Sequence, residues 1–93
     1  MVTLQSKIVI PQDVLFRDVA GEAVILNLET GKYFGLDGVG TRMWALLAEH
    51  GSVETAYWAL LDEYEVNAEQ LQSDLFKLID DLAGHQLLKI DEA

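Results

Sequence analysis

The chain has 93 residues, with sixteen acidic and six basic side chains, so its formal net charge at pH 7 is −10. This length allows one domain, which we expect to span residues 1–93. The few scattered bases disfavour nucleic acid and anionic membrane surfaces as partners, and no apolar run approaches the roughly 20 residues that cross a bilayer. The lack of cysteine excludes disulfides and thiolate metal sites, and together with the lack of a signal-like N-terminus it indicates a cytoplasmic protein.

The first third of the chain contains three segments with the composition of strands. Lys7–Ile10 is a β-branched run that Pro11 ends, and Val14–Asp18 is a second extended candidate. Ala23–Leu28 is the strongest strand, because its side chains alternate between one fully apolar face and one mixed face.

A hairpin is predicted after this strand, because Gly31 supplies the positive φ that a tight turn requires. The strand that returns, Tyr33–Leu36, is short, aromatic and followed at once by a helix. One of its edges therefore lacks an obvious partner, and an unpaired strand edge is a template for another chain. If Phe34 points inward, Tyr33 points the other way.

Three helices are predicted next, over about Val39–His50, Val53–Tyr64 and Asn67 to Leu82 or Ala83. Gly51 separates the first two, Gly84 ends the third, and Leu87–Ile90 is a last strand or an extended tail. The inward positions predicted for the first two helices are Val39, Met43, Leu46, Leu47, Val53, Ala56, Tyr57, Leu60, Leu61 and Tyr64.

This order of elements predicts the fold class. Helix, glycine turn, helix, short loop and longer helix form a helix-turn-helix core, and the preceding hairpin supplies a wing. We therefore expect an α+β, winged helix-turn-helix-like domain with a three-stranded antiparallel sheet followed by three helices.

The third helix sorts into faces when its residues are placed at 100° steps. Its core stripe is predicted to be Leu71, Leu75, Leu78 and Leu82. One flank carries Gln72, Phe76, Ile79 and Ala83, whereas the acids Asp74 and Asp81 lie on the other flank and Asp80 lies nearly opposite the core.

Phe76 lies well off this stripe, so two interpretations remain open. It either widens the buried face, or it forms with Ile79 one wall of a groove whose other wall is the Tyr33–Phe34 strand. The second interpretation predicts that Ile79→Glu weakens ligand binding and leaves the fold intact.

Catalytic chemistry has no support in the sequence. His50 and His85 have no neighbour at metal-ligand spacing, and each lies near a helix C-terminus, where a cation is favourable for structural reasons. No serine has a nucleophile context, and the glycine-rich Gly35–Gly40 segment lacks a P-loop lysine. We expect no enzyme activity, no catalytic residue, no metal and no cofactor.

The segment from Leu26 to Leu47 resembles the PqqD-like family of precursor-peptide recognition elements. The resemblance is carried by an apolar strand, a Thr-Gly-basic-aromatic turn, Leu-Asp, a Val-Gly helix entry and a Trp-x-Leu-Leu helix. This pattern is most similar to the standalone B1-type proteins of lasso-peptide biosynthesis. It extends over nearly the whole chain and is most specific from Tyr33 to Leu47.

The resemblance implies a non-catalytic domain that binds the leader of a ribosomally made precursor peptide. The leader would add as an antiparallel strand to Tyr33–Leu36 and rest against the third helix, about Leu71–Ala83. It also implies a partner enzyme, a B2-type leader peptidase or another modifying enzyme. The peptide chaperone of pyrroloquinoline quinone biosynthesis is the alternative within the family.

The candidate leader-binding residues combine this implication with the groove hypothesis. They are Val24, Leu26, Lys32, Tyr33, Phe34, Gly35, Leu36, Gln72, Leu75, Phe76, Ile79 and Ala83. The acid surplus favours a leader with Lys or Arg, chiefly through the association rate, and the candidate charge contacts are Asp74, Asp80 and Asp81.

Two hypotheses from other functional classes remain. A winged-helix DNA-binding regulator would have the same order of helices, but five acids and no Lys or Arg between Glu49 and Glu65 oppose it. A small acidic subunit that completes a larger enzyme by docking would co-purify with that enzyme without any peptide.

Overall fold

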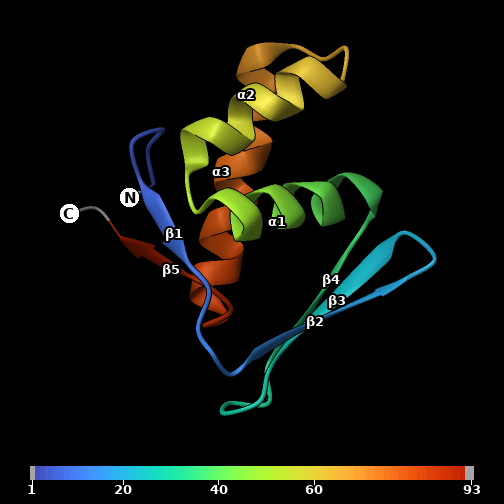
Figure 1. The fold of residues 1–93 in the computed structure, drawn as a ribbon, viewed down its shortest axis with the longest axis vertical. Coiled ribbons are helices and arrows are strands. Elements are labelled where there is room, and N and C mark those ends of the chain that lie inside the picture. The colour runs from blue at the N-terminus through green and yellow to red at the C-terminus, as the bar shows by residue number, and fades with distance from the viewer. Residues whose placement is uncertain (1, 92–93) are drawn as a thin grey trace.

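The computed structural model describes residues 2–91 of the chain. Its elements are β1 (Lys7–Val9), β2 (Val14–Val19), β3 (Glu22–Asn27), β4 (Tyr33–Leu36), α1 (Gly38–His50), α2 (Val53–Glu63), α3 (Ala68–Gly84) and β5 (Lys89–Asp91). Figure 1 shows the helices grouped together, with the β2–β4 strands extending to one side and β1 and β5 on the other. No helix in the described part of the chain is long and apolar enough to cross a membrane.

The predicted fold class is confirmed, with a three-stranded antiparallel sheet in the order β2-β3-β4 followed by three helices. The first predicted strand, β1, lies outside this three-stranded sheet. β1 pairs antiparallel with β5 in a separate two-stranded sheet, in which Ile8 faces Ile90. This pairing joins residues 7–9 to residues 89–91 on the side of the helices away from the larger sheet (Figure 1).

The helix caps follow from side chains that the sequence places at each start. Asp37, Ser52 and Asn67 accept hydrogen bonds from the backbone N–H groups of Gly40, Thr55 and Gln70 at 2.8, 3.2 and 3.0 Å. Gly51 ends α1 in the left-handed region with φ at 65°, as its predicted role requires.

The end of α3 differs from the prediction. Gly84 remains helical, and the left-handed residue that follows the helix is Gln86, with φ at 62°. The Gln86 carbonyl accepts a 2.7 Å hydrogen bond from the buried Asn27 side chain, which fixes this turn against the end of β3.

The core lies between the inner face of the three-stranded sheet and the helices. It contains Ile25 from β3, Leu47 from α1, Leu60 from α2, and Leu75 and Leu82 from α3, all fully buried. Val39 was predicted to face the core, but it is exposed because it lies in the first turn of α1, beyond the end of the sheet. Leu61 and Tyr64, at the end of α2, are only partly buried.

An exposed ion pair links the first two helices. The Arg42 guanidinium donates from Nε and Nη2 to the two Glu63 carboxylate oxygens at 2.8 and 2.6 Å. This hydrogen bonding holds the pKa of Glu63 below its ordinary value, so its small stabilisation is present at neutral pH and is lost as the pH falls through that lowered pKa.

Thr41 joins α1 to the sheet, and we expect Thr41→Val to destabilise the domain. Its buried hydroxyl accepts a 2.9 Å hydrogen bond from the Ala23 N–H, which valine leaves unsatisfied. The expected loss in free energy of unfolding is about 1–3 kcal/mol, measured by urea denaturation. Thr41→Ser keeps the acceptor and is the control; an equal loss in both variants would show that the methyl group, not the hydrogen bond, stabilises this contact.

Candidate functional site

The last strand of the three-stranded sheet, β4, pairs on one side only within residues 2–91. The Asn27 N–H donates to the Lys32 carbonyl at 2.9 Å, and hydrogen-bonded pairs alternate along an antiparallel ladder. The backbone of Phe34 therefore faces β3, whereas the N–H and C=O groups of Tyr33 and Gly35 point to the unpaired side. We call this side the free edge of β4.

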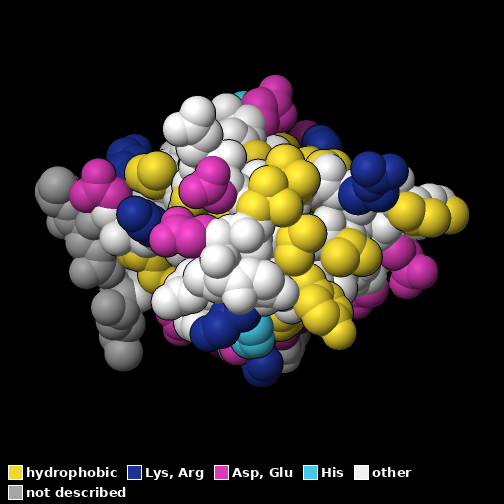
Figure 2. All heavy atoms as spheres, turned by 90° about the horizontal axis from the view of Figure 1, so that it is seen from below, with side chains coloured by type: hydrophobic (Ala, Val, Ile, Leu, Met, Phe, Trp, Pro, Cys, Tyr) yellow, Lys and Arg dark blue, Asp and Glu magenta, His cyan; other side chains and the backbone are white. Residues whose placement is uncertain are grey.

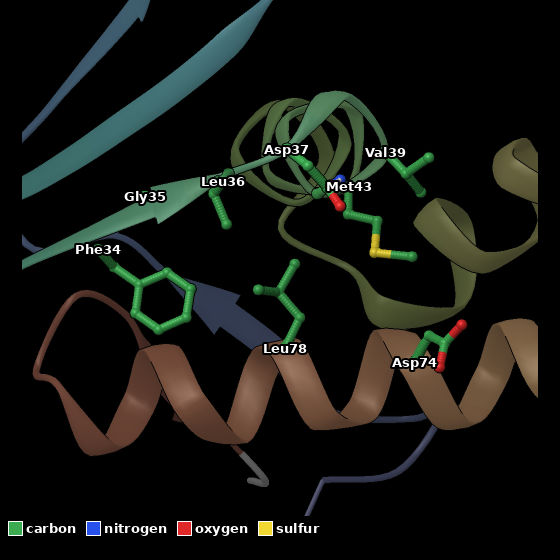
Figure 3. Close-up of a pocket in the computed structure, with 9 residues that line it drawn as sticks. Phe34, Gly35, Leu36, Asp37, Val39, Met43, Asp74 and Leu78 are labelled. Carbon is green, nitrogen blue, oxygen red and sulfur yellow. Dashed lines mark hydrogen bonds between the residues drawn. The ribbon is translucent and has the colours of Figure 1, made fainter.

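A groove of about 430 Å³ lies beside the free edge, between β4, the start of α1 and α3 (Figure 3). Its lining residues are Phe34, Gly35, Leu36, Asp37, Val39, Gly40, Met43, Asp74 and Leu78. The side chains of Phe34 and Leu36 point from β4 toward Leu78 on α3, so an apolar surface runs between strand and helix.

Local packing holds the aromatic wall of this groove in place. The ring of Phe34 meets the His85 ring edge to face, with 5.2 Å between the centroids. His85 is itself held by a 2.7 Å hydrogen bond between its Nδ1 and the Asp81 carbonyl. The turn after α3 therefore contacts β4 and fixes the position of the Phe34 ring at the groove.

The groove also carries two carboxylates, Asp37 and Asp74. Asp37 caps α1, whereas Asp74 Oδ1 accepts a 2.9 Å hydrogen bond from the Gln70 side chain. Neither carboxylate forms an ion pair with a base among the described residues. The groove therefore combines an apolar surface with a negative potential, which suits an apolar side chain next to a basic one.

The structure corrects the predicted faces of α3. Ile79, placed by the sequence on the groove wall, is 0% exposed, and Leu75 is equally buried. Leu78, placed in the core stripe, is only partly buried and lines the groove. The buried stripe runs through Leu71, Leu75, Ile79 and Leu82, so its centre is turned by about 25° toward Ile79 from the predicted position.

The rotation of this stripe moves the groove to the acidic flank of α3. Gln72 and Phe76 remain on the opposite flank, where both are partly buried and Phe76 packs against the core. Ala83, on the same flank, lines a separate hollow with Asn27 and Leu88. The structure therefore does not bring these three predicted residues to the groove.

The predicted residues of the hairpin are divided between two faces. Phe34, Gly35 and Leu36 line the groove, and the side chains of Phe34 and Leu36 share the inward face that strand alternation gives to Phe34. Tyr33 is 71% exposed and points away from it, which settles its orientation. Two further candidates, Val24 and Leu26, lie opposite Gly35 and Tyr33 on the face of the sheet turned away from the helices, and Lys32 is exposed in the turn.

Only one of the three acids predicted as charge contacts lies in the groove. This residue is Asp74. Asp81 binds the Lys77 ammonium at 3.1 Å, and Asp80 is exposed on the far side of the helix. No group of three or more His, Cys, Asp or Glu side chains within residues 2–91 is placed to hold a metal ion.

Sequence reasoning missed five lining residues, which are Asp37, Val39, Gly40, Met43 and Leu78. Of these, Val39, Met43 and Leu78 were predicted to be core residues. The signal that could have found Leu78 is Asp74 one turn before it, since a buried stripe centred on Leu78 would have brought this carboxylate close to the core.

A free strand edge beside an apolar groove is the arrangement of domains that bind peptides by strand addition. The profile of the family described as "Coenzyme PQQ synthesis protein D (PqqD)" matches residues 22–88. The chain belongs to the PqqD family.

Two solved structures have the same fold. "TbiB1 in Complex with the TbiA(beta) Leader Peptide" is 38% identical, with a TM-score of 0.81, over 87% of this chain and 94% of that one. "Lasso peptide synthetase B1 complexed with the leader peptide" is 18% identical, with a TM-score of 0.78, over 89% of this chain and 98% of that one, which shows a common fold. No curated protein matches the chain.

Proposed function

We propose that this protein is a single, non-catalytic recognition domain for the leader of a ribosomally made precursor peptide, of the lasso-peptide type. The leader adds as an antiparallel strand to the free edge of β4 and places side chains in the groove against α3. The protein then presents the bound precursor, in the cytoplasm, to a leader peptidase or another modifying enzyme.

The observation that carries this proposal is the free edge of β4 beside the groove that contains Phe34 and Leu78. Hydrogen bonds to Tyr33 and Gly35 would supply affinity for any extended peptide. The apolar surface next to them would supply specificity, because alternate side chains of an added strand point to the same face. Strand addition requires no reacting group, so no catalytic residue enters this function.

The resemblance to TbiB1 favours a lasso-type leader over the quinone-cofactor peptide chaperone. The 38% identity to TbiB1, whose solved structure contains a leader peptide, extends over most of both chains. The charge of the site adds a further expectation. Asp74 in the groove and the net charge of −10 favour a leader with a Lys or Arg, through faster association.

Binding of a labelled leader peptide tests the proposal. We expect the leader of the precursor encoded beside this protein to bind with a Kd of about 1 μM or tighter, measured by fluorescence anisotropy. Its core peptide without the leader is the matched control and should not bind. Absence of binding to that leader at about 100 μM protein would refute the proposal.

Two competitors distinguish the remaining functions in the same assay. A precursor peptide of pyrroloquinoline quinone biosynthesis that displaces the lasso leader with higher affinity would assign the protein to the chaperone role. Duplex DNA at low salt should leave the anisotropy of the labelled leader unchanged, because the acidic surface repels phosphates.

A further inference from the structure

The outer face of the three-stranded sheet, turned away from the helices, is apolar. The register of the strands places Leu15, Arg17 and Val19 of β2, Glu22, Val24 and Leu26 of β3, and Tyr33 and Gly35 of β4 on this face, so apolar side chains predominate and Glu22 lies at its margin, opposite Val19. Leu15 is 52% exposed, Val24 45% and Tyr33 71%. Figure 2 shows hydrophobic side chains running together across the region of this sheet when the molecule is seen from below. We call this set of residues the outer face.

The strongest strand of the chain thus exposes its more apolar side. β3 buries Ala23, Ile25 and Asn27, whereas it exposes Val24, together with Glu22 at its first position, and partly exposes Leu26. Single exposed hydrophobic residues are ordinary, but a contiguous apolar patch marks an interaction surface. A shallow hollow of about 390 Å³ lies on this patch, lined by Leu15, Phe16, Arg17, Val24 and Leu26.

A basic side chain lies within this patch. Arg17 faces Val24 across the ladder, and no carboxylate forms an ion pair with it in the described part of the chain. Arginine and tyrosine among aliphatic side chains are typical of the residues that dominate binding energy at protein interfaces. The surface that complements the outer face is therefore apolar with a carboxylate opposite Arg17.

A second copy of this chain complements the outer face poorly. Two copies would bring a formal charge of −10 each into one assembly, and that self-repulsion opposes association. A different protein has no such constraint, so charge favours a heterologous partner.

The position of the outer face indicates which protein this partner is. Tyr33 and Gly35 contribute their side-chain positions to the outer face and their backbone groups to the free edge of β4. A protein on the outer face would therefore adjoin a peptide strand added to that edge. We propose that the outer face docks the enzyme that acts on the bound peptide, through an apolar patch of that enzyme with a carboxylate for Arg17. This inference rests on the proposed function.

The test measures binding of the purified leader peptidase encoded beside the precursor, by biolayer interferometry, with and without leader peptide. We expect Val24→Glu and Arg17→Glu to weaken peptidase binding at least about tenfold, since the first places a charge in the apolar patch, across the ladder from Arg17, and the second places a negative charge opposite the expected carboxylate. The matched control is Val66→Glu, because Val66 is 49% exposed between α2 and α3, away from the sheet, and the charge change is the same. The affinity of the Val66→Glu variant for the peptidase should stay within about twofold of wild type.

Leader anisotropy and circular dichroism on the same variants separate the possible failures. All three variants should remain folded and bind the leader as wild type does, because none of these side chains lines the groove. Loss of leader binding in the wild type would refute the proposed function alone, since peptidase affinity is also measured without peptide. Equal peptidase affinity in all variants, or no peptidase binding to the wild type, would overturn the docking surface. A dimer that Val24→Glu converts to monomer in sedimentation velocity would assign the outer face to a second copy and would also overturn it.

Discussion

Leu78→Glu is expected to weaken leader binding at least about tenfold while the domain stays folded, whereas Ile79→Glu, one residue further along α3, is expected to unfold it. The two residues are adjacent in the chain and similar in size, but only Leu78 lines the groove. Ile79 is fully buried. The pair therefore separates the function of the helix from its contribution to stability.

The expected effect at Ile79 follows from its burial. Replacement removes a packed side chain and places a carboxylate in the core, at a combined cost of more than about 5 kcal/mol. A domain of this size has a free energy of unfolding of about 5–15 kcal/mol, so the variant has little or none left. The sequence predicted that Ile79→Glu leaves the fold intact, whereas the structure leads us to expect that it unfolds the domain.

The expected effect at Leu78 is on affinity. Its side chain is partly exposed already, so glutamate can reach solvent and the helix retains a residue of high helix propensity. In the groove, the same change removes apolar contact and adds a negative charge one turn from Asp74. We expect the Kd for the leader to rise at least about tenfold, which corresponds to about 1.4 kcal/mol.

Circular dichroism, urea denaturation and leader anisotropy on both variants check this prediction. Leu78→Met, which conserves volume and hydrophobicity, is the control and should bind as wild type does. A Leu78→Glu protein with wild-type affinity would place the leader outside this groove. A folded Ile79→Glu protein would show that the core around α3 accommodates a charge.

The sequence contained most of the fold because its signals are local. Caps at Asp37, Ser52 and Asn67, and the left-handed Gly51, depend on side chains within a few residues of the backbone that they stabilise. The hairpin likewise follows from Gly31, whose φ is 78°. Such features can be predicted from a single sequence, because the residues that determine them are close together in the chain.

The functional site could be predicted only in part, because it depends on how elements rotate against one another. The sequence places four leucines, Leu78 among them, in one stripe on α3, and Ile79 lies beside this stripe. Either Leu78 or Ile79 could complete the buried face with the other three leucines, and the structure buries Ile79. Which of them is buried is decided by the packing of α3 against the sheet and the other helices, which periodicity alone does not specify.

For the strand β3 as well, the sequence pattern did not show which of its two faces is buried. Alternation separates Val24 and Leu26 from Ile25 and Asn27, but it does not say which pair is buried. The structure buries the pair that includes the polar Asn27, whose side chain bonds the Gln86 carbonyl and accepts from the N–H groups of Glu29 and Thr30. A buried polar group with all of these partners is compatible with the core, which leaves the more apolar side exposed.

Gly35→Pro is expected to weaken leader binding at least about tenfold without unfolding the domain. The Gly35 N–H points to the free edge of β4, so proline removes a donor that an added strand would use. The ladder between β3 and β4 keeps its hydrogen bonds, and proline is tolerated in edge strands where its position faces outward. The loss is therefore expected in affinity, measured by leader anisotropy, and not in the free energy of unfolding.

Gly35→Ala is the matched control for this prediction. A Cβ added at Gly35 meets no atom within 4 Å, and alanine keeps the N–H, so binding should stay within about twofold of wild type. Phe34→Pro provides the opposite comparison, because its N–H faces β3 and its loss should break the ladder and lower stability. Equal affinity of wild type and Gly35→Pro would contradict strand addition to β4. Equal losses in Gly35→Ala and Gly35→Pro would instead locate a contact on the outward side of Gly35, where the peptide and a docked enzyme would meet.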